Sequence, residues 1–427
     1  MTSEDATYRK VTWRLLPLLF LCYVLAYLDR VNVGFAKLQM QKDLAFSDTV
    51  YGIGAGVFFI GYFLFEVPSN LILERVGARI WIARIMILWG LLSSATMFVA
   101  GERSFYVLRF ALGVAEAGFF PGIILYLTYW YTRKHRARMV AGFMTAITLS
   151  GVIGGPVSGF ILARMSGASG LAGWQWLYLL EGLPSVAVGI LVLSLLDDGP
   201  SKAKWLTEDE RDLLARRIRE EEELKAAEGA KHLRLADAFR SGKLWLLAFI
   251  YFCVVMGLYG ISFWLPSILS DTMTSDPWRI GLLTAVPWAA AALVMVTVGR
   301  NSDRTGERRW HTAIPALVAG AAFATSAIPG ISPLPSFAAL TVATCGVMAA
   351  VSCFWSLPTA FLSGTAAAAG IAWINSLGNL AGYVSPFVVG SVRDRTGSMS
   401  AALLVLAGSL LAAGTLTLWT ARMPRRG

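Results

Sequence analysis

Four charged residues lie inside long apolar stretches of the chain: Asp29 and Arg30 in the first stretch, and Arg109 and Glu116 in the fourth. A charge at the centre of a membrane helix costs roughly 2.5–3.5 kcal/mol or more, so such residues usually face water or one another and carry function. Two cations and two carboxylates in the first part of the chain predict a site that binds an anion and moves a proton. A purely structural network of ion pairs is the alternative interpretation.

Helical spacing relates these residues to one another. Arg109 and Glu116 are seven residues apart, which places them on one helix face about 10 Å apart along the axis, suited to lining one pathway. Arg30 shares a face with Tyr27, three residues before it, and an aromatic ring beside a guanidinium suits a carboxylate ligand. Asp29 is rotated by about 100° from Arg30 and therefore needs neighbours on another helix.

The rest of the expected site is polar but uncharged. Asn375, Asn379 and Tyr383 recur every four residues in the eleventh apolar stretch, so they share a helix face that is able to hydrogen-bond a substrate. Hydrogen bonding between helices is an equally good interpretation of that pattern. Tyr62, in the second stretch, is expected to line the same pathway, whereas aromatic packing is the better interpretation of Tyr259.

Two further carboxyl groups lie closer to the ends of apolar stretches. Glu66 falls about two turns from the end of the second stretch, and Glu181 lies near one end of the sixth. We expect both side chains to hold helix ends or to pair with Arg residues in loops rather than to carry protons.

Composition places the chain in a membrane. Of the 427 residues, 56% are hydrophobic and 15% are charged, whereas soluble domains are about 25% charged. The net charge of +10 does not indicate nucleic-acid binding, because the Lys and Arg residues lie between apolar stretches. The four Cys residues show no CxxC spacing and the three His residues lie in polar loops, so we expect no disulfide, metal or cofactor. No nucleophile–base cluster or phosphate-binding loop indicates an enzyme or an ATP-driven pump.

The apolar stretches predict the fold. A membrane-spanning helix needs about 20 predominantly apolar residues, and twelve such stretches predict an all-α membrane protein with twelve transmembrane helices in two six-helix bundles. Because most Lys and Arg residues lie in loops on one side, both termini are expected in the cytoplasm; Arg393 and Arg395 fall on the opposite side without explanation. The stretches are 12–34, 50–73, 80–100, 104–130, 138–163, 174–196, 244–269, 279–299, 311–330, 336–358, 366–391 and 399–421.

A long polar segment divides the stretches into two groups of six. It predicts bundles at 1–197 and 244–427, joined by a cytoplasmic linker at 198–243. Within the linker, Thr207 and Glu210 have the spacing of a capping box, which predicts the start of a short helix.

The two halves echo each other in the loops after the second and eighth stretches. Leu73–Arg79 and Ser302–Arg308 share an acid-Arg-x-Gly-x-Arg pattern, and two six-helix repeats with a site between them are typical of transporters. The pattern resembles the signature loop of the major facilitator superfamily, although Glu74 replaces the usual Asp and Asn70 stands where Gly is common. The resemblance implies that charged loop residues form cytoplasmic latches that change between conformations; these are Glu74, Arg75, Asp303 and Arg304.

Further motifs resemble one family within that superfamily, the anion:cation symporters, and bacterial tartrate transporters look most similar. The motifs cover nearly the whole chain. Members that carry sugar acids and aromatic acids share them, so the resemblance does not name the acid. The motifs are Tyr27–Gly34, Phe65–Asn70, Gly113–Gly118, Trp205–Arg211 and Asn375–Gly390.

We therefore expect a proton-coupled symporter that imports small organic carboxylates of the tartrate or sugar-acid type by alternating access. It would act as a monomer in the inner (cytoplasmic) membrane, with the substrate, protons and the lipid bilayer as partners and no nucleic acid. Arg30 is expected to bind the substrate carboxylate, with Arg109 sharing that task or holding Glu116. Glu116 and Asp29 are expected to carry protons. Substrate contacts are completed by Tyr27, Tyr62, Asn375 and Asn379.

Two other modes of transport stay open from the residues alone. Sodium coupling would show as a sodium requirement without a response to pH. Exchange or efflux is suggested by the fifth stretch, whose Gly154-Gly155-Pro156 resembles a motif of antiporters in the superfamily. Close helix packing explains the same small residues, and the other motifs favour the symporter.

Overall fold

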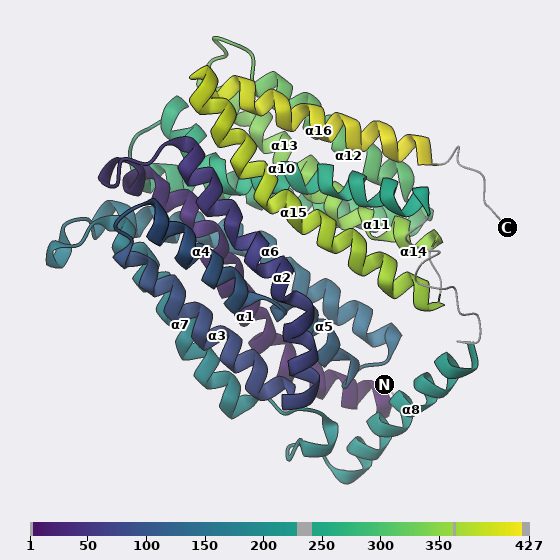
Figure 1. Cartoon of the computed structure of the whole chain (residues 1–427). Helices are drawn as coiled ribbons and strands as arrows, with labels where there is room; N and C mark the ends of the chain where they lie inside the picture. The colour runs from purple at the N-terminus through teal and green to yellow at the C-terminus, as the bar shows by residue number, and fades with distance from the viewer. Residues whose placement is uncertain (1–2, 229–240, 362–363, 421–427) are drawn as a thin grey trace.

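The computed structural model describes residues 3–228, 241–361 and 364–420. These residues form α-helices and short 3-10 helices, and no strand occurs among them. Two sets of helices pack along roughly one direction (Figure 1). The first set comprises α1 Ser3–Asp43, α2 Asp48–Val76, α3 Ala78–Ala95, α4 Glu102–Glu116, α5 Phe119–Thr128, α6 Arg133–Arg164 and α7 Gly173–Leu195, with 3-10 turns at Thr96–Phe98 and Ala168–Gly170.

The linker holds a 3-10 turn at Pro200–Lys202 and helix α8 at Glu208–Glu228. The second set of helices follows it. This set comprises α10 Gly242–Thr272, α11 Pro277–Thr305, α12 Arg309–Ser326, α13 Pro333–Phe354, α14 Ser356–Phe361, α15 Gly364–Thr396 and α16 Met399–Trp419.

Most of these helices are suited to a bilayer. Among the described residues, ten helical spans are long and apolar enough to cross a membrane, and α12 and α15 occupy the other two stretches that the sequence predicts. Large apolar side chains such as Val67 on α2 and Leu293 on α11 are 66% and 72% exposed. Apolar surface of this kind is unfavourable in water but is what lipid chains contact.

One predicted stretch is not a single helix. The fourth stretch breaks into α4 and α5, because Gly118 adopts a left-handed backbone conformation with φ of 83°. A residue with a side chain would be strained there, so glycine allows the break. The predicted span over 104–130 is confirmed as one membrane span, Glu102–Thr128, but it contains two helices, and Glu116 becomes the last residue of α4. The tenth stretch is likewise divided, between α13 and α14.

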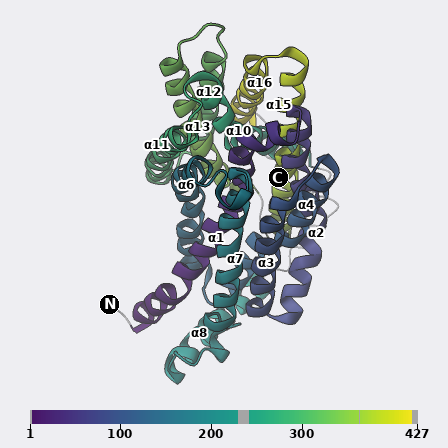
Figure 2. The same cartoon turned by 90° about the vertical axis from the view of Figure 1, so that its left-hand side faces the viewer.

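The two sets of helices meet mainly at one end of the molecule. Figure 1 shows both termini and α8 toward its right-hand side, which we call the terminal end, and the connection between α1 and α2 toward the left, which we call the distal end. In both Figure 1 and Figure 2, α11 lies beside α6. A Cβ atom added at Gly155 of α6 would lie 2.6 Å from the carbonyl oxygen of Gly281 in α11. Glycine at this crossing therefore lets the two backbones touch.

The linker helix begins as its sequence predicts. The backbone N–H of Thr207 donates to Glu210 Oε2 at 2.9 Å, and the N–H of Glu210 donates to Thr207 Oγ1 at 3.3 Å, which confirms the capping box. Lys10 Nζ of α1 also pairs with Glu210, at 2.6 Å. Although partial burial acts in the opposite direction, the hydrogen bonds from Lys10 and Thr207 hold the pKa of Glu210 below its usual value.

Candidate functional site

An ion pair between α1 and α4 forms the centre of the site. Arg30 Nη2 donates to Glu116 Oε1, and the two side chains are 11% and 1% exposed. Glu116 ends α4, where the negative end of the helix dipole disfavours a second negative charge. The guanidinium of Arg30 therefore offsets both the burial of the carboxylate and its unfavourable place on the helix.

Aromatic rings surround Arg30. Its guanidinium carbon lies 5.4 Å from the centre of the Phe58 ring and 5.6 Å from that of Tyr62, both on α2. The hydroxyl of Tyr259 approaches Arg30 from α10 in the second set. Rings at these distances stabilise a cation through their electron-rich faces. Tyr62 was expected here, whereas the sequence pattern favoured core packing for Tyr259, and no residue spacing relates α10 to Arg30.

Arg109 lies beside this pair but does not take part in it. The side chain is fully buried between α2 and α4, where Nε donates to the carbonyl of Gly54 at 3.3 Å and Nη2 to that of Ala55 at 3.4 Å. Its guanidinium carbon is 5.3 Å from the Phe58 ring, so the two arginines share one aromatic neighbour. In the described part of the chain, Arg30 rather than Arg109 pairs with Glu116.

Asp29 points away from Arg30, into the first set of helices. The side chain is 1% exposed and accepts hydrogen bonds from Trp89 Nε1, Ser93 Oγ (2.7 Å) and Ser185 Oγ (3.0 Å), which belong to α3 and α7. The rotation about α1 predicted neighbours on other helices. Those neighbours are neutral donors rather than a cation.

Tyr27 links the two sets of helices. Its hydroxyl lies 3.4 Å from Ser262 Oγ of α10, and its ring meets that of Trp288 of α11 edge-on at 6.3 Å. It thus lies at the boundary between the sets, one turn from Arg30 on the same helix.

The two asparagines expected in the site lie on α15. Asn375 and Asn379 are half-buried. Within the ranges that the structure describes, neither side chain makes a hydrogen bond to another residue. Their donors and acceptors are therefore not committed to helix packing in this conformation, which fits a contact with a substrate.

The signature-loop residues lie apart at the terminal end. Glu74, Arg75 and Arg304 are exposed and make no ion pair among the described residues. Asp303 pairs with the nearby Arg308, at 2.5 Å. The structure thus places the expected latches on the surface without joining the two sets of helices.

A charge network joins the two sets at the distal end instead. Lys37 of α1 pairs with Asp48 of α2 at 2.8 Å. Arg393 of α15 pairs with the same Asp48 at 3.2 Å and with Asp271 of α10 at 2.8 Å. These ion pairs explain why Arg393 lies on the side of the membrane where few basic residues were expected. We call Lys37, Asp48, Asp271, Arg393 and its neighbour Asp394 the distal network.

Asp394 adds a backbone contact to the distal network. Its carboxylate accepts hydrogen bonds from the N–H groups of Asp48 (3.1 Å) and Thr49 (2.7 Å) at the start of α2. Anions are stabilised at helix N-termini, where N–H groups lack partners within the helix. Although partial burial acts in the opposite direction, the bonds from Thr49 and Asp48 hold the pKa of Asp394 below its usual value.

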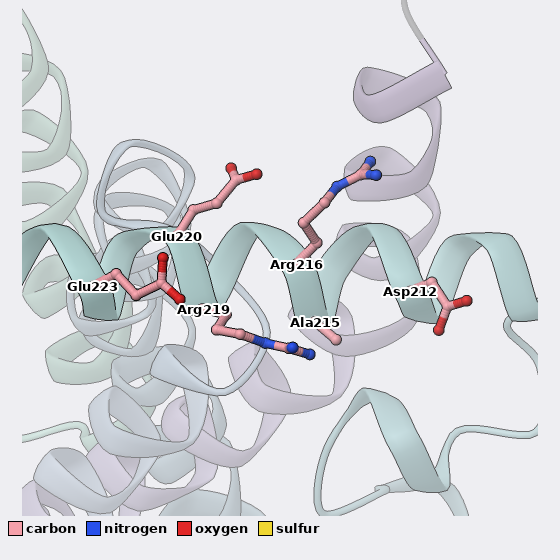
Figure 3. A pocket seen from close by; sticks show the side chains of 6 residues that line it. All are labelled: Asp212, Ala215, Arg216, Arg219, Glu220 and Glu223. Carbon is pink, nitrogen blue, oxygen red and sulfur yellow. The ribbon is translucent and has the colours of Figure 1, made fainter.

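The groove along α8 carries no site of its own. The groove in Figure 3 is lined by one face of α8 alone, and its side chains of both signs point in different directions, so no second element encloses a ligand. Over residues 3–228, 241–361 and 364–420, no group of three or more His, Cys, Asp or Glu residues could hold a metal ion. The residues that line the groove are Asp212, Ala215, Arg216, Arg219, Glu220 and Glu223.

Comparison with known proteins gives a consistent family assignment. The pattern that describes the Major Facilitator Superfamily matches residues 19–386. The chain is 49% identical over 411 residues to the "Putative metabolite transport protein NicT" of Pseudomonas putida, which covers 96% of this chain and 93% of that protein. It is also 49% identical over 419 residues to a "Putative tartrate transporter" of Agrobacterium vitis, which covers 98% and 92%.

A more distant relative and the solved structures complete the comparison. The "Quinolone resistance transporter" of Acinetobacter baumannii is 40% identical over 407 residues, covering 95% of this chain and 93% of that protein. An inward-facing, occupied structure of a bacterial homologue of the human lysosomal transporter Spinster superposes with a TM-score of 0.78 at 17% identity, covering 97% of each chain. The inward-open xylose transporter XylE from E. coli gives 0.75 at 13% identity, again covering 97% of each. These matches confirm the predicted fold class.

Proposed function

Because the chain belongs to the major facilitator superfamily, we propose that it is a proton-coupled symporter that imports small organic carboxylates of the tartrate or sugar-acid type. The observation that carries this proposal is the buried ion pair between Arg30 and Glu116, one cation and one titratable anion at the boundary of the two sets of helices. The relatives named for tartrate transport support the substrate class.

Binding begins with competition for Arg30. A substrate carboxylate and Glu116 are both anions that this guanidinium is able to bind, often through two parallel hydrogen bonds. Arg30 Nε and Glu116 Oε2 have no hydrogen-bond partner, so the pair does not use its full bonding capacity. The guanidinium thus has a donor left for a second carboxylate.

Proton coupling follows from the same competition. A proton on Glu116 removes its negative charge and frees Arg30 for the substrate, and loss of that proton restores the internal ion pair and expels the anion. Proton and carboxylate thus bind together and leave together, as symport requires. Arg109 adds positive charge nearby, and Asp29 is the second proton carrier in the proposal.

Selection of the substrate falls to uncharged groups. Tyr27 and Tyr62 on the first set, and Asn375 and Asn379 on the second, are the proposed partners of substrate hydroxyl groups or of a second carboxylate. Tyr259 joins them because it faces Arg30 from α10.

Transport would proceed by rocking of two bundles, residues 1–197 and 244–427, joined by the linker at 198–243. In this proposal the protein is a monomer in the inner membrane. Both termini lie in the cytoplasm, so the distal end faces outward. The conformation described here then has its outer side closed. Rocking would separate the distal network and bring the signature-loop residues Glu74, Arg75, Asp303 and Arg304 into play at the inner side.

The first prediction tests the proton carrier. Glu116→Gln removes the titratable charge but keeps the size of the side chain, so pH-driven accumulation of a carboxylate in proteoliposomes should fall to the background while counterflow exchange persists in part. A panel of tartrate, sugar acids and aromatic acids identifies the substrate beforehand. Accumulation by Glu116→Gln at the wild-type rate would show that Glu116 does not couple the proton.

Efflux is the second candidate, because one relative is named for quinolone resistance. Reversing the proton gradient in the same proteoliposomes separates the two modes. A symporter accumulates substrate on the side to which protons flow, whereas an antiporter accumulates it on the side from which they come. A requirement for sodium with no response to pH would contradict both.

A further inference from the structure

A third buried carboxyl group lies in the first set of helices, where the sequence pattern predicted a helix-end contact or a pairing with an Arg in a loop. Glu181 of α7 is 5% exposed. Its Oε1 accepts a hydrogen bond from Ser158 Oγ of α6 at 2.7 Å, and no Lys or Arg pairs with it among the described residues. The expectation that Glu181 pairs with an Arg in a loop is therefore wrong for this conformation.

Asn32 connects Glu181 to Asp29. The Asn32 side chain lies beside the Glu181 carboxyl, and its Nδ2 donates to Asp29 Oδ1 at 3.4 Å. Asn32 and Asp29 are three residues apart and so lie on one face of α1. One amide therefore stands between two buried carboxyl groups.

The hydrogen bonding around this amide is incomplete. Asn32 Oδ1 and Glu181 Oε2 are both buried acceptors without a donor. Buried acceptors of this kind are rare in folded proteins, because they lose water without gaining a partner. Asp29 accepts a hydrogen bond from Ser185, one turn after Glu181 on α7, so both carboxyl groups lie between α1 and α7, and two buried carboxylates without a contacting cation add a further penalty. One proton on the pair would supply a missing donor and remove one of the two charges.

We propose that Asp29 and Glu181 form a proton-binding pair, bridged by Asn32, that holds one proton inside the first set of helices. The proton comes from water and converts one carboxylate to a carboxylic acid. This pair deepens the proposed function by giving the second proton a place, and it is separate from the substrate-binding pair at Arg30. The role of this pair in transport rests on the proposed symport. Its protonation does not, because the proton binds without any substrate.

The surroundings of the pair are mostly neutral. Two titratable side chains act electrostatically on the pair: Tyr178, which lies on α7 with Glu181, and Glu116 of α4. Helix α3 contributes the donors Trp89 and Ser93, and α6 contributes Ser158. Because Asp29 has most of these donors, the proton of the pair lies on Glu181 in this conformation, and Asp29, the second proton carrier of the proposed function, shares it through Asn32.

The test is infrared spectroscopy of the purified full-length protein in lipid nanodiscs without substrate. A protonated carboxyl absorbs at a frequency separate from that of a carboxylate. The difference between wild type and Glu181→Gln should contain one protonated carboxyl band at neutral pH, and this band should shift on exchange into D2O. Glu74→Gln is the control, because Glu74 is exposed at the terminal end and its loss should leave the band unchanged.

A second variant guards against loss of folding. Asn32→Leu removes the bridge but keeps both carboxyl groups, and it should shift the band or the pH at which it disappears. Wild type without a band, or Glu181→Gln with the band unchanged, would overturn the proposal. Neither readout involves transport, so failure here and failure of the proposed symport are distinguishable.

Discussion

The two ends of the helix bundle differ in what their charged residues do. At the distal end, Asp48 of the first set pairs with Arg393 of the second at 3.2 Å, and each of the two has a further partner in its own set, Lys37 and Asp271, at 2.8 Å. Lys37 is also buried, with its Nζ 4.0 Å from the Trp264 ring centre. Charges from both sets thus stabilise the contact between them.

At the terminal end the pattern is reversed. The loops with the acid-Arg-x-Gly-x-Arg pattern carry the charges that stand out in the sequence, yet Glu74 and Arg75 are exposed and unpaired within the described residues. A repeated motif therefore marks residues that are able to form contacts between the two sets of helices. Whether the distal or the terminal end forms such contacts depends on the conformation. Among the described residues, the ion pair that joins the two sets is Arg393–Asp48, and neither residue belongs to a sequence motif.

Fixing the distal end in its closed state should have the largest effect on transport. Thr49→Cys combined with Asp394→Cys should form a disulfide, since the Thr49 backbone N–H and the Asp394 carboxylate are only 2.7 Å apart. If the distal end must open during transport, the oxidised double variant should lose nearly all uptake and recover it on reduction. The two single Cys variants are the controls, and full uptake by the oxidised protein would contradict the expectation.

A smaller effect is expected from weakening the distal network. Arg393→Ala removes ion pairs to Asp48 and Asp271, and partly exposed pairs of this kind contribute about 0.2–1 kcal/mol each. Because only the pair with Asp48 joins the two sets, the population with an open distal end should rise by roughly 1.4- to fivefold, since 1.4 kcal/mol is a factor of ten. Labelling of a Ser267→Cys variant by a thiol reagent that does not cross the membrane measures it.

The matched control for that experiment is Arg395→Ala, which removes a cation two residues away that makes no ion pair among the described residues. It should leave labelling unchanged. Equal labelling of all variants would mean that the distal network does not hold the two sets together.

The distal network should also resist mild acid. The pKa of Asp394 is held below its usual value in this conformation, so its contribution is present above the ordinary Asp pKa of about 3.9 and is lost only as the pH falls through the lowered value. Labelling at the distal end should therefore not change through Asp394 between pH 8 and pH 5. Asp394→Asn should label more at every pH in that range, and a change confined to wild type near pH 6 would contradict this account.

The smallest effect is expected at the terminal end. Glu74→Gln should leave the thermal stability of the purified protein within experimental error of wild type, because Glu74 makes no ion pair in this conformation. Surface substitutions without a partner usually change stability by less than about 0.5 kcal/mol. A clear loss of stability would show that the terminal end is latched as well.

The sequence drew attention to the charged residues of the candidate site, but it did not reveal how they pair. The sequence identified Arg30 and Glu116 because a charge in an apolar stretch is conspicuous. It left open whether Arg109 holds Glu116, since both lie on one helix face, and in the structure Arg30 pairs with Glu116 across two helices. Spacing along one helix gives no information about which side chain of another helix will face it.

Local features were predictable for a physical reason. The capping box at Thr207 depends on four consecutive residues and was confirmed. The direction of Asp29, away from Arg30, follows from helical rotation alone. The break after Glu116 was missed because apolar residues continue through it, and Gly118 was the one local signal of a left-handed turn.

The amino-acid sequence alone was enough to identify a helical membrane protein whose charges inside apolar stretches lie in the first half, because hydrophobicity and helical period are properties of the chain. Tertiary structure alone decided that Arg30 meets Glu116 and Tyr259, that Glu181 faces Asn32, and that Arg393 joins the two halves at the distal end. Each of these contacts joins residues far apart in the chain. Their proximity depends on how whole helices pack, which no local pattern of residues encodes.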